Sequence, residues 1–285
     1  MEMNRVTVVL THHHISMYTK NKEENKHFYT EVLGLKLVKE TVNQDNEDMV
    51  HLFYGDNEGV VGTLLTFFEL PNAGQMRKGT NMIARIGLLV EGEESLNYFE
   101  QRLRQAGIAV TQGTYLGHNA RFFDDPEQLS FVLIDNEQRK VPGSWRNPVD
   151  NDVPEQYQIL GLGPIELHVQ EKEKTVAYLK DQLGYEAYEV AEGTLLSLDT
   201  TGHYTDLLVI EKSGPVVRPG RGYVHHHAIG VASHKSLEQV AMLHDAMKVK
   251  HTGIIDRKWF ESLYYTQNGI TYEFATIDVT NDFVD

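Results

Sequence analysis

The sequence of 285 residues contains no cysteine, and this absence limits how the chain can bind a metal. Without thiols it cannot form disulfides, thiolate zinc sites or iron–sulfur clusters. Any metal must therefore be held by nitrogen and oxygen atoms, from the side chains of histidine, aspartate or glutamate.

Long apolar runs and an excess of basic residues are also missing. The N-terminus offers only the apolar run Val8-Val9-Leu10, which is too short for a secretory signal. No segment approaches the ~20 apolar residues that are needed to span a bilayer. The formal net charge of -15 argues against nucleic acid or an anionic membrane as a partner, because both attract basic surfaces. We therefore expect a cytoplasmic protein, and the sequence leaves open whether it forms a homo-oligomer.

Histidine, in contrast, is concentrated in two triplets, at residues 12–14 and 225–227. Each triplet leads into a short apolar stretch, then a polar turn and a helical pattern, so the two stand at equivalent points of a repeated unit. We interpret them as parts of one metal site formed by strands that meet in space, which Glu273 on the last strand would complete. Two histidines and one carboxylate with open coordination positions are the ligand set of non-haem Fe(II) oxygenases.

Alternation along a strand does not decide which histidine of each triplet would bind the metal. In a regular strand, the first and third histidines of a triplet share one face and the second lies on the other. His12 and His227 therefore remain open as ligands alongside their neighbours.

The chain also contains an internal repeat. Its clearest mark is a Leu-Gly pair at the end of a helical pattern, at residues 33–34 and again at 183–184, where glycine suits the left-handed position after a helix. We predict four units, each with a strand, a helix and about three further strands. The units span residues 7–72, 81–136, 157–213 and 221–279. Helical patterns cover residues 95–105, 174–183 and 236–248, and residues 137–157, which contain three prolines, are predicted to link two halves.

These features, together with several short motifs, resemble one known family. In chain order the motifs are His13-His14-Ile15, residues 50–56 with Gly62-Thr63, Arg77-Lys78-Gly79, His225-His226, Asp256-Arg257, residues 260–264, and Tyr272-Glu273. Together they resemble the hydroquinone-type extradiol ring-cleaving dioxygenases of the vicinal oxygen chelate, or glyoxalase-like, superfamily. The resemblance covers nearly the whole chain. It implies an α+β fold of four βαβββ modules in two tandem glyoxalase/extradiol-dioxygenase-type domains, at residues 1–145 and 146–285.

The resemblance also selects His14, His226 and Glu273 as the metal ligands. It implies Fe(II) as the ion, with Mn(II) or another divalent metal as a substitute. Because these residues belong to the first and last units, the site should lie where the two halves of the chain meet. Residues that cannot form an equivalent site stand at the matching positions of the inner units: Arg85, Val132 and Pro164. One metal per chain follows.

For the reaction itself, the resemblance implies roles for four further residues. His13, His225 and Tyr264 match positions proposed to move protons during ring cleavage. Arg257 would hold the developing anion. In one departure from the family pattern, the turn between Tyr264 and Glu273 is one residue shorter than the usual Pro-Gly-Gly form.

The implied function is that of an Fe(II)-dependent dioxygenase that uses O2 to open the ring of a small hydroquinone or catechol-type aromatic substrate. One alternative is a glyoxalase-like metal-dependent isomerase or lyase, and another is a non-catalytic resistance protein that binds an aromatic or electrophilic compound. Isomerase or lyase sites of this type typically use four protein ligands, and a resistance protein needs no metal. A set of three ligands therefore favours the dioxygenase. We also expect Ser16 to line the pocket, and interpret His51 and His168 as structural or surface residues. The sequence names neither the substrate nor the cleavage position.

Overall fold

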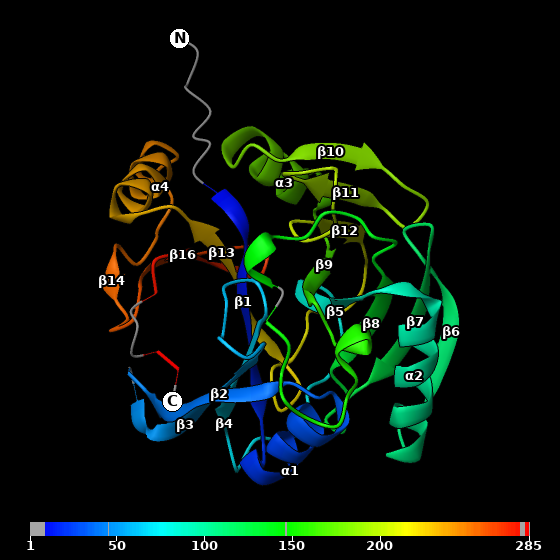
Figure 1. The fold of residues 1–285 in the computed structure, drawn as a ribbon. Helices are drawn as coiled ribbons and strands as arrows, with labels where there is room; N and C mark the ends of the chain where they lie inside the picture. The colour runs from blue at the N-terminus through cyan, green and yellow to red at the C-terminus, as the bar shows by residue number, and fades with distance from the viewer. Residues whose placement is uncertain (1–8, 45, 146, 280–282, 285) are drawn as a thin grey trace.

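The predicted α+β fold of four βαβββ units is confirmed by a computed structural model, which describes residues 9–44, 46–145, 147–279 and 283–284 (Figure 1). Residues 7 and 8 of the predicted first unit lie outside the described residues. The first unit contains β1 (Val9–Thr19), α1 (Lys22–Lys26) with a π-helical turn (His27–Val32), β2 (Lys36–Asn43), β3 (Asn46–Gly55) and β4 (Leu64–Glu69). The second contains β5 (Met82–Val90), α2 (Gly92–Gln105), β6 (Val110–Tyr115), β7 (His118–Asp124) and β8 (Ser130–Asp135).

The second half of the chain repeats this order. Its first unit contains β9 (Gly161–Val169), α3 (Lys172–Ala177) with a π-helical turn (Tyr178–Gln182), β10 (Glu186–Glu189), β11 (Thr194–Ser197) and β12 (Leu207–Glu211). The last unit contains β13 (Val224–Val231), α4 (His234–Ala246), β14 (Ile255–Asp256), β15 (Glu261–Gln267) and β16 (Ile270–Thr276). Gly34 and Gly184 follow the two π-helical turns with φ of 71° and 83°, which is the left-handed conformation predicted for them.

The described strands form two eight-stranded sheets, and each sheet joins units from both halves of the chain. The first has the order β14-β15-β16-β13-β1-β4-β3-β2, and the second has the order β10-β11-β12-β9-β5-β8-β7-β6. Figure 1 accordingly places the blue N-terminal strands beside the orange and red C-terminal strands. The first and last units therefore meet along the antiparallel pair β1 and β13. The division into domains at residues 145 and 146 stays a prediction.

One buried apolar cluster continues through both sheets. It includes Ile15 and Met17 from β1 and Ile86 from β5, all fully buried. The segment between β8 and β9, predicted as a linker, contains 3-10 turns at Gly143–Trp145 and Glu155–Tyr157. It is firmly anchored, because the buried Trp145 donates from Nε1 to the carbonyl of Val61 at 2.9 Å.

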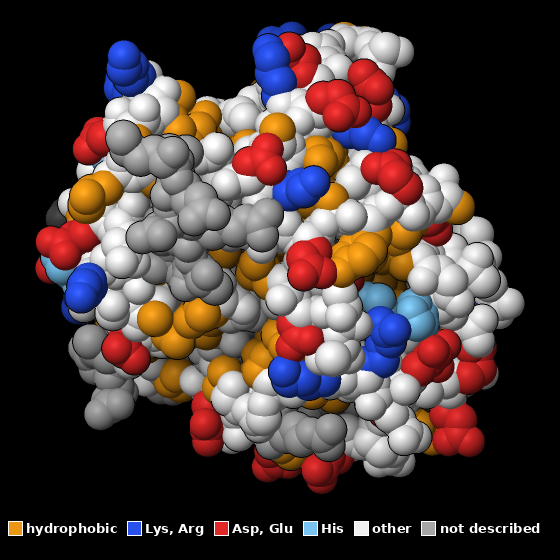
Figure 2. Space-filling view, turned by 90° about the horizontal axis from the view of Figure 1, so that it is seen from above, with side chains coloured by type: hydrophobic (Ala, Val, Ile, Leu, Met, Phe, Trp, Pro, Cys, Tyr) orange, Lys and Arg blue, Asp and Glu red, His pale blue; other side chains and the backbone are white. Residues whose placement is uncertain are grey.

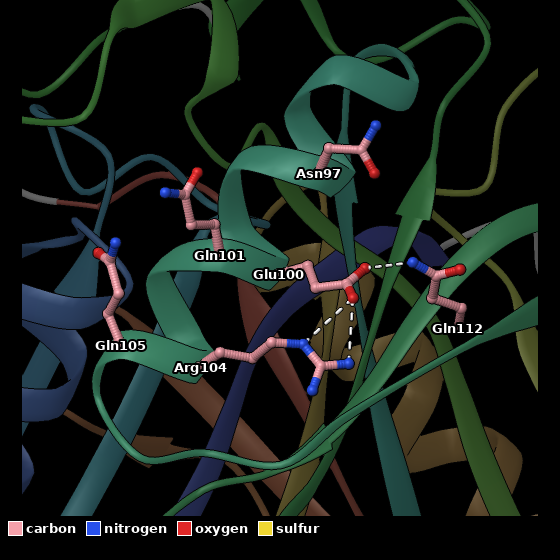
Figure 3. A pocket seen from close by; sticks show the side chains of 6 residues that line it. All are labelled: Asn97, Glu100, Gln101, Arg104, Gln105 and Gln112. Atoms are coloured by element: carbon pink, nitrogen blue, oxygen red, sulfur yellow. Dashed lines mark hydrogen bonds and ion pairs between the residues drawn. The ribbon is translucent and has the colours of Figure 1, made fainter.

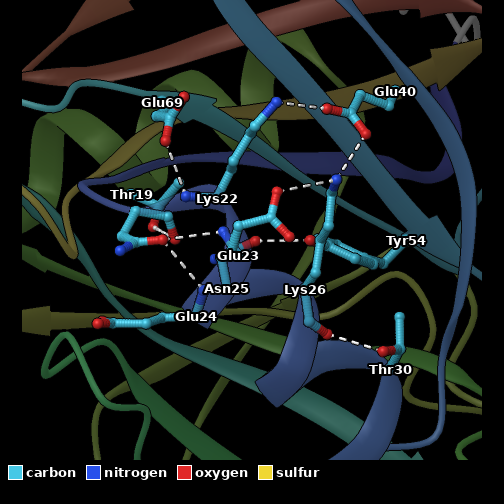
Figure 4. Close-up of polar contacts among 11 residues, drawn as sticks. Thr19, Lys22, Glu23, Glu24, Asn25, Lys26, Thr30, Glu40, Tyr54 and Glu69 are labelled. Atoms are coloured by element: carbon cyan, nitrogen blue, oxygen red, sulfur yellow. Dashed lines mark hydrogen bonds and ion pairs between the residues drawn. The ribbon is translucent and has the colours of Figure 1, made fainter.

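The helical segment after β1 is held by polar contacts (Figure 4). Lys22 and Lys26 both bind Glu40 of β2, at 2.9 and 2.6 Å. The hydroxyl of Tyr54 donates to Oδ1 of Asn25 at 2.8 Å, and this hydrogen bond is buried. These contacts fasten α1 to β2 and β3, which form part of the cavity wall described below.

The surface carries the acidic excess of the composition. On the face in Figure 2, Asp and Glu side chains are spread among Lys and Arg side chains and small apolar patches. Among the described residues, no helix combines the length and apolar character needed to cross a membrane.

Candidate metal centre

Three side chains from different strands meet at one buried point. Nε2 of His14 lies 3.2 Å from Nε2 of His226 and 3.1 Å from Oε2 of Glu273. Nε2 of His226 lies 2.8 Å from the same carboxylate oxygen. The strand register explains the meeting, because Ala228 of β13 pairs with His14 of β1 on one side and with Glu273 of β16 on the other. In the part of the chain that the structure describes, this is the only group of three or more potential metal ligands.

The first histidine triplet contains a break in the strand alternation. In the pairing of β1 with β13, His12 lies opposite Ile229 and His14 lies opposite Ala228, so two steps along β1 match one step along β13. This is the geometry of a β-bulge, which re-aims side chains and interrupts the regular alternation. As a result, His13 and His14 lie together, with their Nδ1 atoms 2.9 Å apart.

The second triplet contains the complementary irregularity. Here Ser16 pairs with His226 and Met17 pairs with Val224, so His225 is the extra residue on β13. His225 and His226 also lie together, with their Nδ1 atoms 2.7 Å apart.

The alternation expected from the sequence is therefore wrong within both triplets. It would place His12 and His14 on one face and His13 on the other. Instead, the ring of His12 contacts the ring of His227, with Nδ1 of His12 2.9 Å from Nε2 of His227. Both rings of this pair are fully buried, and neither lines the cavity beside the three ligands. The bulges are the physical reason for the difference, because each inserts one residue into the period-two pattern.

Hydrogen bonds of His13 determine which nitrogen of His14 is free to bind a metal. His13 must donate from Nε2 to the carbonyl of Thr276, at 3.2 Å, because a carbonyl can only accept. Burial lowers the pKa of His13 to about 3, so its ring is neutral and its Nδ1 carries no proton. That Nδ1 accepts from Nδ1 of His14. Nε2 of His14 is left with a lone pair, directed towards His226 and Glu273.

This arrangement fits a bound cation. Burial by itself would raise the pKa of Glu273. The neighbouring His14 and His226 outweigh this effect and hold the pKa well below its usual range, so the carboxylate is charged. The short contacts to the two imidazoles lack hydrogen-bond geometry, and neither oxygen of Glu273 has a hydrogen-bond partner among the described residues. A buried carboxylate that faces nitrogen lone pairs is costly unless a positive charge lies between them. Two imidazole nitrogens and one carboxylate suit Fe(II), Mn(II) or a similar divalent ion.

The three candidate ligands line a cavity of about 520 Å³. Of the residues predicted to act in the reaction, His225, Arg257 and Tyr264 line this cavity, whereas His13 does not. Tyr264 of β15 pairs with Glu273 of β16, and the guanidinium of Arg257 lies 5.1 Å from the centre of the Tyr264 ring. Burial raises the pKa of Tyr264 well above its ordinary value, so its hydroxyl stays protonated.

The short turn after Tyr264 does not displace that residue. β15 and β16 are joined by Asn268 and Gly269, with φ of 50° and 74°. An Asn-Gly pair with two positive φ angles is the preferred two-residue hairpin turn, because its twist matches that of the strands. The hairpin register therefore keeps Tyr264 directly opposite Glu273.

Much of the remaining cavity wall is aromatic, and most of it was not predicted. His51, Phe53 and Phe68 come from β3 and β4, and Trp259 and Phe260 come from the segment before β15. His51, interpreted from the sequence as structural or surface, thus belongs to the cavity wall. The alternation of His51 and Phe53 places them on one strand face, but the sequence does not indicate what that face meets. Ser16 lines the cavity, as expected.

The equivalent positions of the second sheet offer no ligand set. In the pair β5 and β8, Gly87 lies opposite Val132, which holds the position that Glu273 has in β16. Arg85, two residues before Gly87, pairs with Glu166 at 2.8 Å between Nη1 and Oε2. An apolar valine and a paired arginine cannot hold a divalent ion.

A second hollow lies on the outside of α2, next to β6 (Figure 3). Its polar side chains bind one another, because Glu100 accepts hydrogen bonds from Arg104 at 3.1 Å and from Gln112 at 2.8 Å. It lacks the converging ligand atoms of the first cavity.

The chain is similar to known proteins in sequence and in fold. Residues 11–133 match the family described as the Glyoxalase/Bleomycin resistance protein/Dioxygenase superfamily. A Bacillus subtilis (strain 168) protein named "Putative ring-cleaving dioxygenase MhqA" is 37% identical over 274 residues, which cover 93% of this chain and 86% of that protein. A Sphingobium indicum protein named "Chlorohydroquinone/hydroquinone 1,2-dioxygenase" is 24% identical, with 95% and 86% covered. The crystal structure titled "putative dioxygenase from Bacillus subtilis subsp. subtilis str. 168" matches with a TM-score of 0.87 and 25% identity, over 95% of this chain and 86% of that one.

Four βαβββ units in two sheets, with one candidate metal centre between the first and last units, define a protein of the vicinal oxygen chelate type. The chain belongs to the Glyoxalase/Bleomycin resistance protein/Dioxygenase superfamily. The names of its relatives confirm the resemblance to ring-cleaving dioxygenases that the sequence motifs indicated.

Proposed function

We propose that this protein is a ring-cleaving dioxygenase of the extradiol type, which uses Fe(II) and O2 to open a hydroquinone or catechol-type ring. His14, His226 and Glu273 would hold the metal. The observation that carries the proposal is the convergence of these three buried side chains in the wall of a partly aromatic cavity. The names of two relatives, a ring-cleaving dioxygenase and a chlorohydroquinone/hydroquinone dioxygenase, support the reaction and the class of substrate. Mn(II) or another divalent ion suits the same ligands.

A ferrous ion at this site would supply open coordination positions at which a substrate hydroxyl and O2 come together. The protein's own residues would orient the ring and exclude water. Phe53 and Phe68 of the first sheet and Phe260 from the segment before β15 offer flat apolar surfaces for an aromatic ring. The polar groups of the same cavity include the ligands and His225, Tyr264 and Arg257.

His225 is suited to donate a proton. If His226 binds the metal through Nε2, its Nδ1 carries a proton and donates to Nδ1 of His225, 2.7 Å away. Burial lowers the pKa of His225 to about 4, so the ring is neutral and its single proton sits on Nε2. This nitrogen is the one left to donate to a substrate oxygen in the cavity, and a proton that it gives up would be replaced at Nδ1 by the proton of His226. His13 has both ring nitrogens engaged, so we assign it a positioning role on His14.

Tyr264 and Arg257 would stabilise negative charge on the substrate. The protonated hydroxyl of Tyr264 can donate to a substrate oxygen that loses its proton. Arg257, whose guanidinium lies over the Tyr264 ring, would stabilise the negative charge that develops during cleavage.

Oxygen consumption tests the proposal. Protein purified without air and loaded with Fe(II) is mixed with hydroquinone, chlorohydroquinone or catechol, and O2 uptake is recorded with 18O2. We expect one O2 consumed per ring opened, with both oxygen atoms in the product. Glu273→Ala protein provides the control without a complete ligand set. A product formed without O2 would favour the isomerase or lyase, and tight binding of every compound without turnover would favour the resistance protein.

A further inference from the structure

His51 stands out in the cavity because it is a polar ring in close contact with two aromatic rings. Its ring centre lies 4.0 Å from that of Phe53 and 4.1 Å from that of Phe68. Phe53 is two residues further along β3, and Phe68 is the partner of His51 on β4. Both contacts are tilted, with 40° and 32° between the ring planes, and they restrict how the His51 ring can turn.

Only one nitrogen of His51 is engaged by the protein. Nε2 lies 3.2 Å from the hydroxyl of Thr66, which lies 2.7 Å from the hydroxyl of Ser16 on β1. Nδ1 makes no hydrogen bond with the described residues, yet it is not enclosed by protein as the unpaired nitrogens of His12 and His227 are. His51 lines the cavity, so this nitrogen is available to a molecule bound there.

The chain of hydroxyls makes that nitrogen a good partner for another hydroxyl group. If Thr66 donates to Nε2, the neutral ring carries its proton on Nδ1 and donates into the cavity. If Nε2 donates to Thr66, Nδ1 keeps a lone pair and accepts from the cavity. A hydroxyl both donates and accepts, so it fits either state. Burial lowers the pKa of His51 well below its ordinary value, which keeps the ring neutral.

The position of His51 in the sheet places it away from the candidate ligands. His14 lies on β1 and His51 on β3, with β4 between them. Since neighbouring strands lie ~4.8 Å apart, ~10 Å of sheet separates the two strands. A benzene ring with hydroxyls at opposite ends can place one near the ligands and the other near His51. A ring with adjacent hydroxyls has both at the same end.

On the basis of the function proposed above, we infer that His51 binds the second hydroxyl of a 1,4-dihydroxybenzene whose first hydroxyl is at the metal end. His51 is thus a specificity residue that favours 1,4-dihydroxybenzenes over 1,2-dihydroxybenzenes. Thr66 and Ser16 position it through their hydroxyl chain.

Anaerobic binding tests this role without any need for turnover. Calorimetry compares the affinities of the Fe(II)-loaded protein for hydroquinone and for 4-methylphenol, in which a methyl group replaces the second hydroxyl. The wild-type protein should prefer hydroquinone, and His51→Phe should reduce that preference ~10- to 100-fold, as expected for one lost buried hydrogen bond. An unchanged preference in His51→Phe would overturn the inference. His27→Phe, the same substitution at an exposed position, is the matched control.

Turnover gives the second measurement and separates the two proposals. His51→Phe should raise KM for hydroquinone by a similar factor and lower kcat/KM for hydroquinone more than kcat/KM for catechol. If wild-type protein consumes no O2, the proposed function fails, while the binding comparison still decides the role of His51. If His51→Phe does not fold, His51→Leu removes the same nitrogens with a smaller side chain, and the same outcomes apply.

Discussion

Nδ1 of His13 lies 2.9 Å from Nδ1 of His14, although the two residues are consecutive in a β-strand. Consecutive side chains of a regular strand point to opposite faces, and the bulge in β1 removes that separation. The contact sets the tautomer of His14 and leaves its Nε2 available to a metal. His225 and His226 repeat the relationship on β13, with 2.7 Å between the same atoms.

Removal of any one candidate ligand should abolish stoichiometric metal binding. We expect wild-type protein purified without air to bind about one divalent ion per chain through nitrogen and oxygen ligands. His14→Ala, His226→Ala and Glu273→Ala should each lower the metal content to background, because two ligands hold an ion weakly in competition with water. Elemental analysis after dialysis measures the effect, with the exposed His234→Ala as control. Stoichiometric metal in all three variants would show that the metal binds at other residues.

Loss of His13 should weaken metal binding without abolishing it. In His13→Phe, Nδ1 of His14 loses its acceptor, and the tautomer that presents Nε2 to the metal is no longer favoured. Outer hydrogen-bond partners of metal ligands typically contribute ~10- to 100-fold in affinity, so we expect a loss in that range by competition with a chelator.

His13→Gln provides a test of this explanation. Its amide oxygen can accept from His14 while its NH2 group donates to the carbonyl of Thr276. This variant should retain more of the affinity than His13→Phe. Equal losses in both variants would argue against the tautomer explanation.

Tyr264→Phe and His225→Phe should lower kcat while metal content stays close to one per chain. Both residues line the cavity, and the loss of a proton-transferring group typically costs ~10²- to 10⁴-fold in rate. Steady-state O2 uptake, with metal analysis of the same samples, measures the effect. A loss confined to KM would indicate a substrate-binding role, and full activity would remove the residue from the mechanism.

The stability of the protein should depend on the ionisation of Asp125 in the turn after β7. Its Oδ1 accepts from the backbone N–H groups of Glu127 and Leu129, and Tyr29 donates to its Oδ2. Burial raises the pKa of Asp125 from 3.8 to about 7, so the folded state holds this proton more tightly than the unfolded state. The contribution is fully present below about pH 4 and is lost as the pH rises to about 7.

Asp125→Asn cannot ionise and should lack this dependence. Relative to the wild type, the variant should therefore gain stability between pH 5 and pH 8. The gain should be ~1.4 kcal/mol for each pH unit between pH 5 and the pKa of Asp125 in the folded state. Urea unfolding of both proteins at the two pH values measures the difference. Parallel pH dependence of the two proteins would contradict a raised pKa for Asp125.

The sequence by itself determined the order of the elements and the residue types of the site. Local patterns are sufficient for this, because a glycine after a helix, such as Gly34, and the repeated strand and helix periods depend on near neighbours. The absence of cysteine and the two histidine triplets limited the metal chemistry to nitrogen and oxygen ligands. The family motifs then pointed to His14, His226 and Glu273, which the structure brings within 3.2 Å of one another.

Only the tertiary structure decided which side of β1 and β13 each histidine occupies. The bulges at His13 and His225 arise in the pairing of strands that are about 200 residues apart, so no local pattern contains them. The position of His51 depends in the same way on the pairing of β3 with β4 and on the cavity beside the ligands. Strand alternation predicts that His51 and Phe53 share a face, but long-range packing decides that this face lines the cavity.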